Sequence, residues 1–192
     1  SPSDCQACDV GKHGIIHDDI TVPVNESVTC NVCPKGEYQD QTGILGCKQC
    51  HAGRYNAKQG TSAHEHDALV DCAICSNGKY HAQRGADNIS QCLDCAAGKH
   101  AAIHENTTVP SNESIACNVC PKGMYQDQIG MLMCQNCTAG RYNSKSIDVA
   151  SGHDRLADCT ICDNGKYSTS IQSISPSDCQ ACDVGKHGII HD

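Results

Sequence analysis

The sequence predicts a small disulfide-rich tandem repeat, an elongated rod of short β-hairpins and loops with little helix. Three observations lead to this fold class. The 192 residues include 18 cysteines, no Trp and no Phe, and Tyr is the only aromatic residue, with six copies. All the cysteines fall into C-x-x-C pairs, and the pairs recur at a fixed period. Because aromatic side chains usually dominate a core, this chain must draw its stability from cross-links or metal.

The nine C-x-x-C pairs define a repeat of 87 residues. Their first cysteines are separated by 25, 17, 25 and 20 residues, and the same four intervals then recur. Residues 175–192 are identical to residues 1–18, which lie two periods earlier. The chain therefore reads as unit A (1–87), unit B (88–174) and the start of a further unit A (175–192), a window of a longer array. The pairs begin at Cys5, Cys30, Cys47, Cys72, Cys92, Cys117, Cys134, Cys159 and Cys179.

Each pair is followed by the same short pattern. Two residues, a Gly, one further residue and a Tyr or His follow every C-x-x-C, as in residues 33–38. We expect the Gly to supply a left-handed turn that a Cβ would resist, and the ring to lie against a disulfide. After this turn the pattern predicts a hairpin with one strand around Tyr38 and another near Leu45. In longer loops such as 64–71 we expect no more than a single helical turn.

Two chemistries use paired C-x-x-C motifs. Zinc ribbons bind one ion with four thiolates, and the intervals Cys33–Cys47 and Cys75–Cys92 are near that spacing. Disulfides are favoured because the chain carries N-x-S/T sequons, which suit the secretory pathway. The net charge of −8 also gives no reason to expect a nucleic-acid-binding zinc protein. We therefore expect no metal, and no cofactor other than covalent N-glycans.

The connectivity of the disulfides does not follow from sequence alone. As a hypothesis, the second cysteine of each pair bonds the first cysteine of the next, which leaves Cys5 and Cys182 to bond neighbouring modules outside the window. Each bridge closes a loop of roughly 15–25 residues, which contributes about 3 kcal/mol in chain-entropy models. This ladder consists of Cys8–Cys30, Cys33–Cys47, Cys50–Cys72, Cys75–Cys92, Cys95–Cys117, Cys120–Cys134, Cys137–Cys159 and Cys162–Cys179.

Five sequons mark candidate N-glycosylation sites, at Asn25, Asn112, Asn106, Asn88 and Asn136. Asn25 and Asn112 occupy the same position in units A and B, so they are the strongest candidates. Asn136 lies between the two cysteines of one pair, where a disulfide would crowd a glycan. A sequon licenses only a surface site, so these positions must be exposed.

Histidine pairs are a second candidate for metal binding. His13 and His17 are four residues apart, and His64 and His66 are two apart. Zinc and copper use imidazole ligands, but no helix is predicted that would place these rings on one face. A His at the ring position, as at His13, simply replaces Tyr. Packing is therefore the favoured role.

Catalysis, nucleic-acid binding and membrane insertion have no sequence support. The chain contains no nucleophile elbow, P-loop or H-E-x-x-H motif, and no carboxylate pair in a recognisable setting. Lys and Arg total 14 against 22 Asp and Glu, whereas phosphate binding needs a basic face. No segment has the apolar length of a membrane span, and none looks like a signal peptide. We expect a protein that is not an enzyme.

Residues Cys30–Cys50 follow the pattern C-x-x-C-P-x-G-x-Y-x-x-x-x-G-x-x-x-C-x-x-C. This pattern resembles the ephrin-receptor-like cysteine-rich repeat, which is related in style to EGF-like and TNF-receptor-like modules. The sequence departs from it in that Pro follows the pair only at Pro34 and Pro121. The resemblance implies extracellular, disulfide-bonded, elongated modules that space or display other domains. Repeat regularity and glycosylation also resemble the cysteine-rich repeat proteins of protist extracellular fibres, including mastigonemes.

Taken together, the sequence favours a secreted structural glycoprotein, the repeat segment of a filament in a cell-surface appendage, sheath or matrix. Its expected partners are copies of itself or related repeat chains, because regular repeats support open, filament-forming contacts. One alternative is a receptor or adhesion ectodomain built of ligand-binding cysteine-rich modules, in which the copies would be expected to diverge. The other is a zinc-binding C-x-x-C repeat protein.

Overall fold

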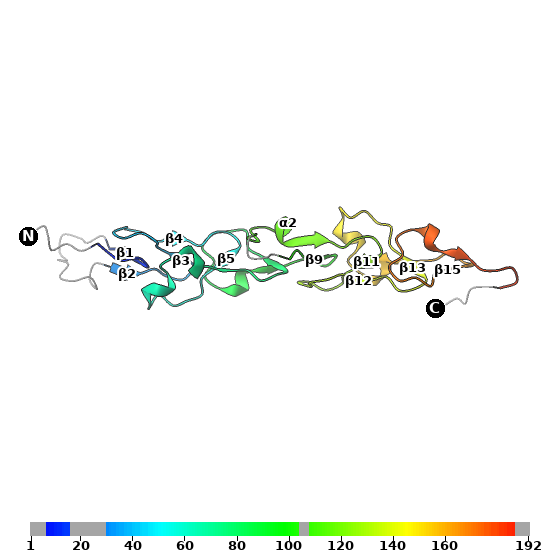
Figure 1. The fold of residues 1–192 in the computed structure, drawn as a ribbon, viewed down its shortest axis with the longest axis horizontal. Helices are drawn as coiled ribbons and strands as arrows, with labels where there is room; N and C mark the ends of the chain where they lie inside the picture. Colours follow the sequence, from blue (N-terminus) through cyan, green and yellow to red (C-terminus); the bar gives the residue numbers. More distant parts are fainter. Residues whose placement is uncertain (1–6, 16–29, 104–107, 187–192) are drawn as a thin grey trace, which may run out of the picture. The chain divides into compact units, whose positions relative to one another are not determined.

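The computed structural model describes residues 7–15, 30–103 and 108–186, in which short hairpins follow one another in sequence order (Figure 1). The chain divides into two compact bodies. The first body comprises residues 1–76, 80–93 and 104–113, and the second comprises residues 77–79, 94–103 and 114–192. Residues 108–113 of repeat unit B therefore belong to the first body.

Two-stranded sheets are the main secondary structure, and each joins two strands that are consecutive in the chain. One strand contains the ring position, and the other contains the two residues between the cysteines of the next pair. In the β3–β4 hairpin, for example, Tyr38 lies opposite Lys48 in an antiparallel register. The strands are β1 (Lys12–Gly14), β2 (Cys30–Val32), β3 (Glu37–Tyr38), β4 (Lys48–Gln49), β5 (Arg54–Tyr55), β6 (Ala73–Ile74), β7 (Lys79–Tyr80), β8 (Leu93–Asp94), β9 (Lys99–Ala101), β10 (Cys117–Val119), β11 (Met124–Tyr125), β12 (Gln135–Asn136), β13 (Arg141–Tyr142), β14 (Thr160–Ile161), β15 (Lys166–Tyr167) and β16 (Gln180–Ala181).

Helical structure in the described part of the chain is confined to single turns. The α-helix α2 has four residues, and the other turns are 3₁₀ segments of three residues each. The loop 64–71 contains the end of one such turn and the whole of a second, where the sequence predicts one. The helical segments are η2 (Ala63–Glu65), η3 (Leu69–Asp71), η4 (Ile89–Gln91), α2 (Glu113–Ala116), η5 (Ala150–Gly152), η6 (Leu156–Asp158) and η7 (Pro176–Asp178).

The glycine after every C-x-x-C pair has a positive φ, which confirms the predicted left-handed turn. The nine φ values lie between 76° and 83°, a region that glycine enters without a Cβ penalty. Each turn also bonds to the next module. The carbonyl of Gly36, for example, accepts a hydrogen bond from the N–H of Cys50 at 2.8 Å. The same bond recurs at each of the eight steps between consecutive pairs, from Cys33 to Cys182.

The buried core consists largely of cysteine. Fourteen cysteines are buried, against two tyrosines, Tyr38 and Tyr125. Tyr38 packs against the disulfide Cys50–Cys72, and Tyr125 packs against Cys137–Cys159. The prediction that the ring lies against a disulfide is thus confirmed at these two positions.

The other tyrosines do not form such a core. Tyr55, Tyr80 and Tyr142 are half-buried, and Tyr167 is exposed. The expectation of a small aromatic core in every module is therefore too general.

The second strand of the first predicted hairpin lies further along the chain than expected. It is β4 (Lys48–Gln49) rather than a strand near Leu45, so that part of the prediction is wrong. The buried side chain of Gln39 explains the difference. Its Nε2 donates to the carbonyl of Gly46 at 2.5 Å, and its Oε1 accepts from the N–H of Gln41 at 3.1 Å. These bonds hold the intervening residues in a loop, and the second strand begins only after Cys47.

Candidate functional site

Eight disulfides join the described cysteines, each from the second cysteine of one pair to the first cysteine of the next. They are the same eight bonds as in the ladder hypothesis, with sequence separations of 22, 14, 22 and 17 residues that recur in the same order. Cys182 is half-buried and forms no disulfide with a described residue. Cys5 lies outside the described residues. The array is therefore cross-linked at every step between described pairs.

This ladder leaves few thiolates for a zinc site. A cysteine binds zinc as a thiolate, and sixteen of the cysteine sulfurs are bonded to each other in the eight disulfides. Within residues 7–15, 30–103 and 108–186, no three or more His, Cys, Asp or Glu side chains are grouped to hold a metal ion. The sulfurs of the eight disulfides are therefore not thiolates that could bind zinc.

His64 and His66 do not form a pair in the structure, since one is exposed and the other buried. His64 is exposed, and its Nδ1 lies 3.4 Å from a carboxylate oxygen of Asp67. His66 is fully buried. His17 lies outside the described residues, so the pair with His13 is not defined. His64 and His66 therefore lie in different environments, although only one residue separates them in the sequence.

A buried polar cluster surrounds His66 in the first body. Its Nδ1 lies 2.9 Å from the carbonyl oxygen of Glu37, and its own carbonyl accepts from the N–H of Gln39 at 2.8 Å. The buried side chain of Asn56 donates through Nδ2 to the carbonyl of Glu65 at 2.9 Å. These polar groups satisfy backbone atoms of two successive modules, which explains why they are buried in so thin a core.

The same cluster recurs in the second body, one period later. Asn143 and His153 are fully buried, and Asn143 Nδ2 donates to the carbonyl of Gly152 at 3.0 Å. His153 Nδ1 lies 3.0 Å from the carbonyl of Met124, and Gln126 N–H donates to the carbonyl of His153 at 2.8 Å. Sequence reasoning missed this cluster. The recurrence of Gln, Asn and His at a spacing of 87 residues is the signal that would have found it.

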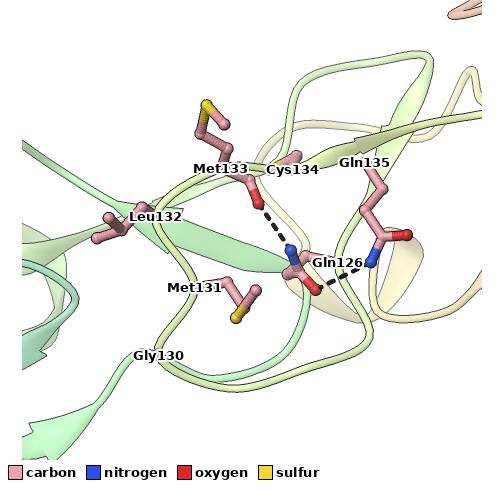
Figure 2. Close-up of a pocket in the computed structure, with 7 residues that line it drawn as sticks. All are labelled: Gln126, Gly130, Met131, Leu132, Met133, Cys134 and Gln135. Atoms are coloured by element: carbon pink, nitrogen blue, oxygen red, sulfur yellow. Dashed lines mark hydrogen bonds between the residues drawn. The ribbon is translucent and has the colours of Figure 1, made fainter.

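The loop between β11 and β12 presents an exposed apolar surface, here called the hairpin-tip surface. It consists of Ile129, Met131, Leu132 and Met133, of which Leu132 is 58% exposed and Met133 77% exposed. Figure 2 shows the side chains of Leu132 and Met133 pointing away from the amide of Gln126. Gln126 Nε2 donates to the carbonyl of Met133 at 2.7 Å. The buried amide thus holds the loop backbone while the side chains of Leu132 and Met133 face outward.

The counterpart of this surface in the first body is also exposed. The loop between β3 and β4 carries Ile44 and Leu45, which are 39% and 65% exposed, and Gln39 holds its backbone in the way described above. Exposed apolar patches of this kind mark interaction sites more often than isolated apolar residues do. A hairpin-tip surface is therefore present once in each 87-residue unit.

Three of the five sequons lie in the described part of the chain, and all three asparagines are exposed. Asn112 lies directly before α2, and Asn136 lies in β12. Asn88 caps η4, where its Oδ1 accepts from the N–H of Ser90 at 2.9 Å, so the cap does not use the Nδ2 atom that carries an N-glycan. Asn25 and Asn106 lie outside the described residues.

The ladder of disulfides, each closing one short hairpin, defines the chain as a tandem cysteine-rich repeat of the small disulfide-rich class. Within that class, residues 21–66 and 107–147 match the family described as tyrosine-protein kinase ephrin type A/B receptor-like. These two segments, a little under half of the chain, are similar to ephrin-receptor-like cysteine-rich modules. A search of curated proteins gives no match to the chain.

The disulfides and the family together indicate an extracellular domain, because such cross-links persist in oxidising compartments. In the part of the chain that the structure describes, helices are too short and too polar to cross a bilayer.

Proposed function

We propose that this chain is the repeat segment of a structural extracellular glycoprotein, which assembles with copies of itself or related repeat chains into a fibre. The observation that carries the proposal is the uniform bonding between consecutive modules. Every step between described pairs has a disulfide, and the carbonyl of each turn glycine that follows a C-x-x-C pair, from Gly11 to Gly165, accepts from a cysteine N–H of the next pair. An array in which every module is bonded to the next gains stability as modules are added.

In this proposal the hairpin-tip surfaces are the contacts between chains. Each is small, so one contact alone binds weakly. A surface that recurs in every unit of an array multiplies the contacts between two such chains, and linked weak contacts raise overall affinity strongly. The apolar character of Leu45 and Leu132 supplies the driving force, since burial of apolar area contributes about 25 cal/mol per Å².

Covalent N-glycans complete the proposal. Asn112, Asn88 and Asn136 are exposed and each begins an N-x-S/T sequon. Glycans at these positions add hydrophilic surface and hinder proteases. The proposal assigns no catalytic residue and no cofactor beyond these glycans. Glycopeptide mass spectrometry of native material measures the occupancy at each asparagine.

The test compares the parent chain with a double variant, Leu45→Asp and Leu132→Asp, by analytical ultracentrifugation and negative-stain electron microscopy. We expect the parent to associate with rising concentration and the double variant to stay monomeric, because a charge at each tip opposes desolvation. Val70→Asp is the matched control, since Val70 is 81% exposed outside the tips. A parent that remains monomeric, or a double variant that associates equally well, would contradict the proposal.

A receptor or adhesion ectodomain is a second candidate function, supported by the match to ephrin-receptor-like modules. In that case the modules present or bind a ligand instead of packing against each other. The full-length gene distinguishes the two: a membrane span followed by a cytoplasmic domain favours a receptor, and many further 87-residue units favour a fibre.

A further inference from the structure

Most of the glycine turns are covered by a loop from further along the chain. A Cβ built on Gly36 would overlap the carbonyl of Gly85, and one built on Gly123 would overlap the carbonyl of Gln172. In each case both residues belong to the same compact body. The other covered turns are Gly11 by Ala63, Gly53 by Val109 and Pro110, Gly78 by Gly130, and Gly98 by Ala150.

The turn at Gly53 shows how such a cover is built. A Cβ on Gly53 would lie 2.6 Å from Cγ1 of Val109 and 2.8 Å from the carbonyl carbon of Pro110. Gly53 N–H donates to the carbonyl of His81 at 2.7 Å, and His81 N–H donates in turn to the carbonyl of Pro110 at 3.1 Å. The Val-Pro segment therefore packs on Gly53, and its proline carbonyl accepts the hydrogen bond of the His81 N–H.

The equivalent turn at Gly140, one period later, has no such cover. Gly140 has the same φ of 79° as Gly53, and its N–H donates to the carbonyl of Ser168 at 2.9 Å. Nothing in the described structure lies within 4 Å of a Cβ built on Gly140. No described carbonyl accepts the N–H of Ser168, and the adjacent Tyr167 is 46% exposed. The same backbone thus lacks its partner segment.

The repeat sequence contains a segment that fits this place. Val109 and Pro110 belong to Thr-Val-Pro in the first long loop of unit B, and unit A has Thr-Val-Pro at the same position, residues 21–23. Residues 175–192 repeat residues 1–18, so a further unit A would follow unit B. Its Val-Pro would then lie the same number of residues after Gly140 as Val109 and Pro110 lie after Gly53.

We infer that the turn formed by Gly140 and Ser168 is a docking site for the Val-Pro segment of the next 87-residue unit. The valine side chain covers the glycine, and the proline carbonyl accepts the N–H of Ser168. Proline suits this segment because it brings no N–H of its own into the contact. The inference rests on the proposed function only in that both require the repeats to continue in tandem.

The test compares the 192-residue chain with an extended chain in which residues 19–87 follow Asp192. Hydrogen exchange of the Ser168 amide, measured by NMR, should slow by about 100-fold or more in the extended chain, since a bonded amide exchanges only on opening. Val22→Gly together with Pro23→Gly in the appended unit should restore fast exchange. The His81 amide, which has its cover in both chains, is the internal reference.

Three outcomes would overturn the inference. One is equal exchange at Ser168 in both chains while the appended disulfides form and His81 stays protected. Another is protection that rises with the concentration of the 192-residue chain, which would assign the site to a second molecule. The third is a Gly140→Ala substitution that destabilises the extended chain less than Gly53→Ala does, because the inference expects the two substitutions to be equally destabilising there and unequal only in the shorter chain. Fibre formation is scored separately, so a docked chain that forms no fibre would count only against the proposed function.

Discussion

Removal of one rung by the double substitution Cys50→Ala and Cys72→Ala tests whether disulfides replace a hydrophobic core in this chain. The bond spans a sequence separation of 22 residues, for which chain entropy contributes about 3 kcal/mol. Both cysteines are fully buried and pack with Tyr38, so lost packing adds about 1 kcal/mol. The expected loss is therefore about 4 kcal/mol, a large part of the stability of a typical domain.

The assay is hydrogen exchange with mass spectrometry under oxidising conditions. Because the Cys50–Cys72 bond closes the loop 51–71 itself, and stacked repeats are stabilised by modules close to them in the array, we expect peptides from residues 51–71 to lose protection. Peptides from residues 138–158, the matched loop closed by Cys137–Cys159, should keep theirs and so serve as an internal control. Val70→Ala, at an exposed position in the affected loop, should behave like the parent.

Two results would refute this reasoning. Parent-like protection at residues 51–71 in the double variant would mean that packing and hydrogen bonds hold the loop without the bond. Equal loss of protection at residues 138–158 would mean that the chain unfolds as a whole, and that stability does not add module by module.

Three further predictions concern single positions. Gly36→Ala should lower the free energy of unfolding by about 2 kcal/mol or more, because a φ of 76° strains an L-residue and the added Cβ would meet the loop at Gly85. Gly46→Ala, with open space around it, is the control and should change this free energy by less than about 0.5 kcal/mol. Thermal denaturation measures both. Gln126→Ala should cost about 2–3 kcal/mol in urea denaturation, since its buried amide bonds two backbone groups, and Gln128→Ala, exposed, should be near neutral; equal effects would argue against the role of the buried amide. Alkylation of the unreduced 192-residue chain should label Cys182, which is unpaired among the described residues, and spare the sixteen bonded cysteines; broad labelling would remove the basis of the fold.

The pattern of cysteines and glycines carries the local structure because that structure is local and covalent. A disulfide between successive pairs closes a loop of at most 22 residues in separation, and the glycine turn needs only a backbone without Cβ. The eight bonds, the nine left-handed turns and the hairpins between pairs all lie within such distances. Two neighbouring motifs therefore contain most of the information that each module needs.

The contacts between modules could not be predicted from the spacing of cysteines and glycines. The position of β4 depends on a buried amide of Gln39 that holds a loop, which no alternation of apolar residues reveals. The burial of His66 and the exposure of His64 depend on which ring faces Glu37, although the two are close in sequence. Hydrogen bonds from polar groups to the neighbouring module determine which of these side chains are buried.

The sequence by itself determined the repeat length, the class of fold and the turns, because cysteine spacing and glycine conformation act within one module. Only the tertiary structure decided which polar side chains are buried, which apolar ones face outward and which later loop covers each glycine. Those outcomes depend on hydrogen bonds and packing between residues about 30 to 60 positions apart, such as Gly53 and Pro110, and spacing along the chain does not specify them.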